Sequence, residues 1–236
     1  MNRMDIKRAS YLFEGMKGRM LPEELINTIR SFIATENLYS SATREIATKL
    51  ENLNSEFNST HERNPIHLIQ TRVKTPASIM DKLKRRGFEL SVESARKNLT
   101  DIAGVRVICS YINDIYIISG LLLSQNDIQL VRTTDYIKNP KTNGYRSLHH
   151  IVRVPVFLSH KVEMVNVEIQ IRTIAMDFWA SLEHDLAYKL EREKSEEAFT
   201  ELKACAEEIA GIDRRMQRLY NISAEQQVSQ EGDVQK

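Results

Sequence analysis

The sequence predicts an α+β protein in which a mixed β-sheet of about five strands is flanked by helices. Apolar residues recur at helical spacing toward both ends of the chain. Between them lie four segments rich in Val and Ile, at residues 103–111, 128–137, 148–157 and 162–172. A short polar turn joins the last two segments, so this pair is predicted to be an antiparallel hairpin. An antiparallel pair argues against a doubly wound parallel sheet.

The helices are predicted from start signals and apolar periodicity. The first sixty residues read as helix, with a start signal at Pro22, and a further helix begins at Thr75-Pro76. A helix over 173–193 is expected to turn its apolar stripe of Phe178, Leu182 and Leu186 toward the core. The helix over 196–220 also has an apolar side, which could pack on its own domain or on a second copy, and the pattern alone favours neither.

The predicted organisation is an N-terminal helical extension (1–62), a central domain (63–192), a C-terminal helix (193–222) and a disordered tail (223–236). With 33 basic and 32 acidic residues the net charge is +1, so no stable nucleic-acid partner is expected. Two cysteines without metal-ligand spacing predict reduced thiols. No apolar run reaches the roughly 20 residues of a membrane span, and we expect a cytoplasmic protein.

A basic stretch at residues 72–86 is the first candidate binding segment. Within its helix, Ser78, Lys82 and Arg85 share one face, and Arg72 and Lys74 precede the N-terminus. Phosphate groups favour such a helix start, because backbone N–H groups and the helix dipole add to the side-chain charge. Charge runs are more often a solvated face, and that interpretation is favoured for this stretch taken alone.

The loop at residues 138–147 is the second candidate. Asn143-Gly144 is a turn signal, Lys141 and Arg146 supply positive charge, and Tyr145 supplies a surface on which a base could stack. An ordinary hairpin loop explains the same residues equally well. Earlier in the chain, Arg106 lies among apolar strand residues and therefore needs a partner, which could be an anion or the face of a base.

Two acidic residues complete the candidate site. The period-2 rule places Glu168 with Asn166, Gln170 and Arg172 on one face of a strand whose other face is apolar. Asp101 precedes another strand, where capping is about twice as favoured as metal binding. Together, two carboxylates can hold Mg²⁺ against a triphosphate, and one can accept a proton from an attacking hydroxyl.

The order of these motifs resembles the synthetase domain of the RelA/SpoT family, over roughly residues 64–190. The matching runs are 72–74 with Ser78 and Lys82, then 101–106, 143–149, 168–173, and Trp179 with Glu183-His184. The short chain resembles a small alarmone synthetase, and the runs at 135–145 and 174–179 look closer to the RelP branch than to the RelQ branch.

The resemblance implies a nucleotidyltransferase-like fold and Mg²⁺-dependent transfer of pyrophosphate from ATP to the 3′-hydroxyl of GDP or GTP. It further implies that Asp101 and Glu168 bind the metal and that Glu168 activates the hydroxyl. The residues implied for ATP are Arg72, Lys74, Ser78, Lys82, Arg85 and Arg106.

The resemblance also assigns the acceptor nucleotide, GDP or GTP. Its binding residues would be Lys141, Tyr145, His149, Gln170 and His184. The family suggests a homotetramer.

Three other functions can be compared with this interpretation. The first seventy residues lack the several His and Asp that a metal-dependent hydrolase needs, so no alarmone hydrolysis is expected. A relative with the same fold could instead pyrophosphorylate the 3′-end of tRNA, although the near-neutral charge argues weakly against this. An inactive nucleotide- or RNA-binding module is the other candidate, and the presence of both carboxylates and Tyr145 argues against it.

Overall fold

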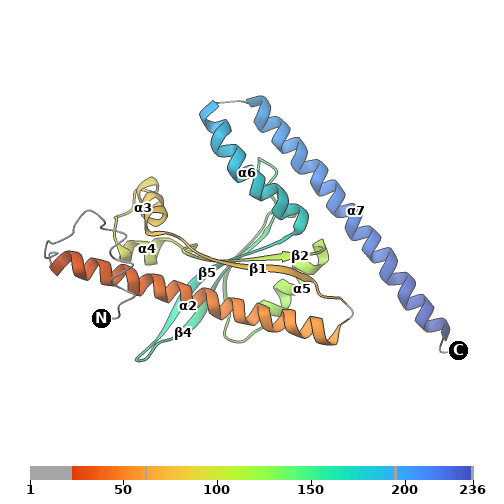
Figure 1. Cartoon of the computed structure of the whole chain (residues 1–236), viewed down its shortest axis with the longest axis horizontal. Helices are drawn as coiled ribbons and strands as arrows, with labels where there is room; N and C mark the ends of the chain where they lie inside the picture. The colour runs from red at the N-terminus through yellow and green to blue at the C-terminus, as the bar shows by residue number, and fades with distance from the viewer. Residues whose placement is uncertain (1–22, 62, 194–195, 235–236) are drawn as a thin grey trace, which may run out of the picture.

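The structure, a computed structural model, describes residues 23–61, 63–193 and 196–234 (Figure 1). Its elements in chain order are α2 (Glu23–Thr60), β1 (Ile66–Val73), α3 (Pro76–Arg85), α4 (Val92–Asn98), β2 (Ala103–Cys109), α5 (Ile112–Leu123), β3 (Gln129–Asp135), β4 (Leu148–Phe157), β5 (Val162–Thr173), α6 (Ile174–Glu193) and α7 (Glu196–Val234). The prediction for residues 1–22 lies outside this described part.

The sheet has five strands in the order β1-β2-β5-β4-β3. The central pair β2–β5 is parallel and the other three pairs are antiparallel, which confirms the predicted mixed sheet. The strand β1 was not among those predicted from sequence. This strand forms one edge of the sheet and most of its side chains are exposed, so its apolar signal is weak.

Helices α2 and α5 cover one face of the sheet. The β5 residues Val165, Val167, Ile169 and Ile171 are each at most 4% exposed and belong to the core cluster that includes residues from α2 and α5. The predicted alternation along β5 is therefore confirmed. The opposite face carries Glu168 and the polar residues of its row.

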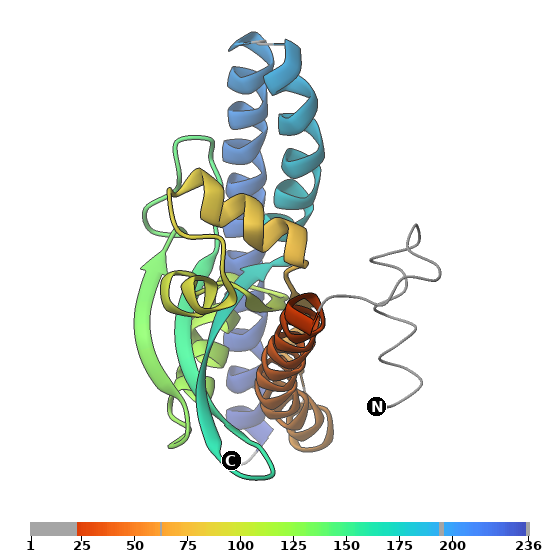
Figure 2. The same cartoon turned by 90° about the vertical axis from the view of Figure 1, so that its left-hand side faces the viewer.

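Helix α6 rises away from the sheet, and α7 runs back beside α6 and on toward α5 (Figures 1 and 2). The prediction that Phe178, Leu182 and Leu186 face the core is wrong, because these side chains are 42–58% exposed. The buried positions of α6 include Trp179 and Ala180, which pack on Ala206 of α7. Since both sides of α6 carry apolar residues, periodicity could not identify the covered side.

Helix α7 continues to Val234, beyond residue 222, where sequence analysis ended the helix and expected a disordered tail. The residues from 223 onward include four Gln and two Glu, which are good helix formers that need no buried face to extend an existing helix. No helix among the described residues is long and apolar enough to cross a membrane.

A buried ion pair fixes the start of α5. The Asp114 side chain is 1% exposed; it accepts hydrogen bonds from both terminal nitrogens of Arg63, at 2.8 and 2.5 Å, and from the backbone N–H of Tyr111. Arg63 also stacks over the rings of Tyr111 and Tyr220, and Tyr220 belongs to α7. Asp114 thus links the turn before β1, the start of α5 and, through Arg63, helix α7.

We expect Asp114→Ala to lower the free energy of unfolding by about 3–5 kcal/mol, because it leaves the Arg63 charge without its partner. Chemical denaturation would measure this loss. The control is Asp127→Ala, which breaks the more exposed pair with Lys49 and should cost less than about 1 kcal/mol. Equal losses in the two variants would contradict the prediction that the Arg63–Asp114 pair stabilises the fold more than the Lys49–Asp127 pair.

Candidate active site

An open cavity of about 790 Å³ lies on the sheet face opposite α2, between β1, β2, β5 and α6. This volume is within the range of roughly 300–1,000 Å³ that is usual for small-molecule sites. The residues predicted from sequence that line it are Arg72, Asp101, Arg106, Tyr145, Glu168 and Gln170. The structure therefore brings the two distant carboxylates, two arginines and the loop tyrosine to one cavity.

Asp101 lies at the entry to β2 between two lysines. Its Oδ2 accepts hydrogen bonds from the Nζ of Lys74 and of Lys82, at the end of β1 and on α3 respectively. Burial alone would raise the pKa of Asp101, but the two lysines outweigh this effect and hold the pKa below its usual value. The other oxygen, Oδ1, is buried and has no hydrogen-bond partner, so its capacity to accept is unused.

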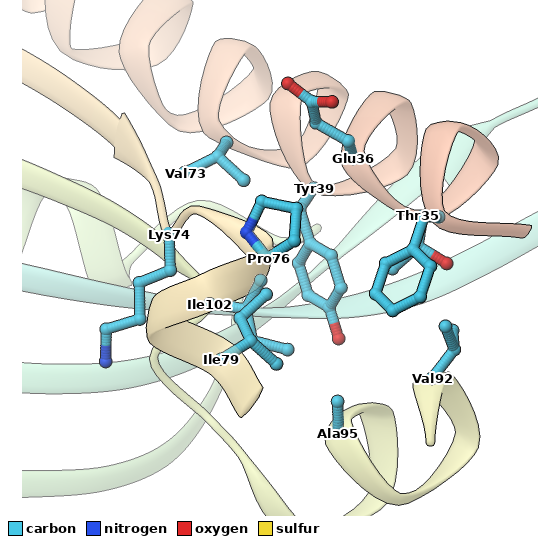
Figure 3. A pocket seen from close by; sticks show the side chains of 11 residues that line it. Thr35, Glu36, Tyr39, Val73, Lys74, Pro76, Ile79, Val92, Ala95 and Ile102 are labelled. Carbon is cyan, nitrogen blue, oxygen red and sulfur yellow. The ribbon is translucent and has the colours of Figure 1, made fainter. Parts of the chain in front are cut away.

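Apolar side chains pack around the segment that carries Lys74. A small cavity of about 20 Å³, room for about one water molecule, is lined by Val73, Pro76 and Ile79 together with Tyr39 of α2. Figure 3 shows the amine of Lys74 pointing away from these side chains. The aliphatic part of the Lys74 side chain therefore lies beside apolar residues, and its ammonium group lies beside Asp101.

Glu168 on β5 is held by two neighbours. Gln170 Nε2 donates to its Oε2 at 3.0 Å, and His149 Nδ1 lies 3.5 Å from its Oε1. Burial would raise the pKa of Glu168, but His149 and Gln170 outweigh it, so the pKa lies below its usual value. The negative charge of Asp101 acts in the opposite direction and raises this pKa.

The aromatic wall of the site is built around Tyr145. Its hydroxyl is 2.8 Å from His149 Nε2, and the two rings meet nearly edge to face at a centroid distance of 5.8 Å. The amine of Lys141 lies 4.7 Å from the centre of the Tyr145 ring and 4.9 Å from that of Tyr136. Burial raises the pKa of Tyr145, so the phenol stays protonated at neutral pH.

Arg172, to which sequence analysis assigned no role, connects the parts of this site. The side chain is only 2% exposed, and one terminal nitrogen donates to the Tyr145 hydroxyl at 2.8 Å and to Gln170 Oε1 at 2.6 Å. The other nitrogen donates to Asp177 Oδ1 at 3.2 Å, which also accepts from Arg106 at 3.2 Å. Period-2 alternation placed Arg172 on the same face as Glu168, but the link through Asp177 requires the fold.

The hydrogen bonds of Tyr145 indicate which of its neighbours donates and which accepts. Because Arg172 donates to the Tyr145 oxygen, the phenol hydrogen is free to be donated to His149 Nε2. With Nε2 accepting that hydrogen, the ring N–H lies at Nδ1, which is 3.5 Å from Glu168 Oε1. The carboxylate is therefore oriented by a chain of donors and is kept in its acceptor form.

Six of the predicted site residues whose side chains the structure describes do not line the cavity, and four of them contact residues that do: Lys74, Lys82, Lys141 and His149. Ser78 accepts a hydrogen bond from Thr75 Oγ1 at the start of α3, and Arg85 is exposed at the end of the same helix; neither lines the cavity. The side chain of His184 is outside those that the structure describes. The roles of these residues remain predictions.

The donor set fits Mg²⁺ better than a transition metal. Among the described residues there is no cluster of three or more His, Cys, Asp or Glu side chains that could enclose a metal. Mg²⁺ does not need such a cage, because it is commonly held by one or two carboxylates together with substrate phosphates and water. The unpartnered Oδ1 of Asp101 and the ionised Glu168 at the same cavity satisfy that requirement.

Comparison with known proteins identifies the family. Residues 71–193 match the model of the region found in RelA/SpoT proteins. The chain is 46% identical to the GTP pyrophosphokinase YwaC of Bacillus subtilis over 179 residues, which are 76% of this chain and 85% of the relative. It is 35% identical to the GTP pyrophosphokinase YjbM of the same organism over 182 residues, which are 77% and 84% of the two chains.

Solved structures have the same fold. The small alarmone synthetase 1 of B. subtilis, bound to its product pppGpp, superposes with a TM-score of 0.77 at 32% identity, covering 83% of this chain and 99% of that one. The small alarmone synthetase 2 of the same organism superposes with a TM-score of 0.73 at 42% identity, covering 81% and 98%. The chain therefore belongs to the RelA/SpoT family and has the fold of the small alarmone synthetases.

Proposed function

We propose that this protein is a (p)ppGpp synthetase that transfers the pyrophosphoryl group of ATP to the 3′-hydroxyl of GDP or GTP. The observation that carries the proposal is the convergence of Asp101, Glu168, Arg106 and Tyr145 on one cavity. Relatives called GTP pyrophosphokinases, and a similar synthetase solved with pppGpp, support the same reaction. The assignment to the RelP-like branch depends on sequence runs alone and stays a prediction.

In the proposed arrangement the adenine lies between Arg72 and Arg106, and the ATP phosphates meet the lysines beside Asp101. Phosphoryl transfer depends on positioning and on neutralising charge, so this cluster supplies most of what the donor side needs. Asp101 and Glu168 would hold Mg²⁺, which neutralises phosphate charge when bound. A similar synthetase solved with AMPCPP supports a nucleotide on the donor side.

On the acceptor side, Tyr145 would stack on the guanine while Lys141, His149 and Gln170 position the nucleotide. Glu168 would accept the proton of the 3′-hydroxyl as the oxygen attacks the β-phosphorus of ATP and AMP leaves. Glu168 can take this role because it is ionised at neutral pH and its two neighbours fix its direction. No alarmone hydrolysis is expected.

Incubation of the protein with ATP, Mg²⁺ and either GTP or GDP, resolved by ion-exchange chromatography, tests the proposal. The expected products are AMP and a guanosine nucleotide that carries two further phosphates. A parallel reaction with tRNA and labelled ATP addresses the alternative of a tRNA-modifying toxin. Label transferred only to tRNA would favour that alternative, and no transfer to either acceptor would favour an inactive binding module.

The Tyr145 ring is expected to contribute mainly to acceptor binding. Tyr145→Ala removes a stacking surface worth about 1–3 kcal/mol, so the KM for GTP should rise roughly 5- to 150-fold. Tyr145→Phe keeps the ring but loses the hydroxyl that bridges Arg172 and His149, so it should reduce kcat more than it raises KM. Initial-rate kinetics at saturating ATP would separate the effects; equal KM values for Ala and Phe would contradict stacking.

We also propose that the protein self-associates, as a tetramer, in the cytoplasm. The exposed side chains of Phe178 on α6 and of Ile212, Met216 and Leu219 on α7, which are 48–60% exposed, support self-association. Both cysteines are free thiols, which agrees with a reducing compartment. Light scattering measures the oligomeric state directly, and a monomeric mass would contradict this part of the proposal.

A further inference from the structure

We propose that helix α7 holds the loop carrying Tyr145 in the shape that binds the acceptor, with Ala206 and Glu207 as positioning residues. This inference rests on the proposed function, since it concerns how the guanine-stacking ring is held. The family match ends at residue 193, so α7 lies outside the matched region. Its contacts with the loop therefore add a component to the site that the matched region does not contain.

The loop backbone touches α7 at Gly144. This glycine has a φ of +91°, a left-handed conformation that disfavours other residues. A Cβ at this position would lie 2.5 Å from the Cβ of Ala206, closer than two carbons can approach. A cavity of only about 10 Å³, at the lower limit for one water, lies beside this contact. Small residues on both sides thus permit direct contact between the loop and the helix.

Arg146 ties the same two segments together. Its side chain is 10% exposed, and one terminal nitrogen donates to both carboxylate oxygens of Glu207, at 3.0 and 2.9 Å. The other nitrogen donates to the carbonyl of Gly144 at 2.9 Å and to the carbonyl of Ala206 at 3.4 Å. One guanidinium therefore joins the loop backbone, the helix backbone and a helix side chain, through hydrogen bonds strengthened by its charge.

Tyr145, between these two residues, packs on the cluster of Trp179, Ala180 and Ala206. Trp179 is itself fixed to α7, because its Nε1 donates to the carbonyl of Leu202 at 3.0 Å. The surface on which the Tyr145 ring packs is thus formed by α6 and α7 together. A shift of α7 would move that surface even if every residue of the loop were unchanged.

The contact matters for binding because ordering a loop costs conformational entropy. If α7 orders the loop before the acceptor arrives, the nucleotide does not have to meet that cost when it binds. The donor side is different: the described contacts of Lys74, Lys82 and Asp101 involve β1, α3 and the start of β2, not α7. Loosening α7 should therefore weaken acceptor binding selectively.

Glu207→Lys tests this directly, because it places a second positive charge beside Arg146 while changing a half-exposed side chain. The KM for GTP should rise at least about fivefold, the lower limit for losing a stacking contact. The KM for ATP and the kcat at saturating GTP should change little. The matched control is Glu208→Lys, the same charge change at the next, exposed position of α7, which should leave all three values unchanged.

Ala206→Leu is the second variant, since it pushes directly on Gly144, and it should show the same selective rise. If this buried substitution prevents folding, Glu207→Lys alone decides. The emission of Trp179, the only tryptophan, reports whether α6 and α7 remain packed. An unchanged KM for GTP in Glu207→Lys, or an equal rise of both KM values, would overturn the inference. Failure of the wild type to form product would instead refute the proposed function.

Discussion

Glu168→Gln should reduce kcat about 10³-fold or more while ATP binding remains nearly intact. A positioned general base contributes roughly 10²–10⁴-fold, and this substitution also removes one of two proposed metal ligands. Glutamine has nearly the same shape as glutamate, and Gln170 and His149 would still surround it. The loss should therefore appear in turnover and not in the fold.

Three measurements separate these effects: single-turnover rates, equilibrium binding of a non-hydrolysable ATP analogue, and thermal unfolding. Glu163→Gln is the matched control, because it makes the same change on β5, where Glu163 pairs with Arg96 and Lys161 away from the cavity. The control should retain wild-type turnover. A Glu168→Gln protein that turns over at the wild-type rate would remove the proposed base from the mechanism.

The strand β5 shows how much of the site could be predicted from sequence. Its apolar row and its polar row are separated by strict alternation, so the face that carries Glu168 and Gln170 was predictable. The edge strand β1 was not identified, because most of its side chains point to solvent or to the cavity and it has little buried apolar surface. Position in the sheet, and not local sequence, determines that pattern.

Long-range contacts account for what sequence analysis missed in the site. Arg106, Arg172 and Asp177 belong to β2, β5 and α6, and their shared hydrogen bonds exist only because these elements meet. Similarly, Gly144 signalled a turn, but nothing local indicated that the turn lies against Ala206. For α6, apolar residues on two sides made the choice of the buried side ambiguous, and packing on α7 decided it.

Asp101→Asn should lower activity about 10³-fold, comparable with the loss of other charge-stabilising groups in active sites, and should shift the Mg²⁺ requirement upward. The aspartate offers one unpartnered oxygen to a cation, while its other oxygen is shared by Lys74 and Lys82. The asparagine amide has a single oxygen and no charge. It therefore cannot bind the metal and also accept hydrogen bonds from both lysines. Its neutral side chain would also leave the two ammonium groups facing each other without compensation.

Activity titrated against Mg²⁺ concentration measures both consequences. The apparent Mg²⁺ requirement of Asp101→Asn should rise at least about tenfold, the size of effect known for changes around metal ligands. Asp81→Asn is the control, since this exposed acid lies on α3 beside Lys82 but does not line the cavity. A Mg²⁺ dependence of Asp101→Asn identical to that of the wild type would mean that Asp101 only neutralises the lysines. Glu168 would then have to hold the metal with the phosphates alone.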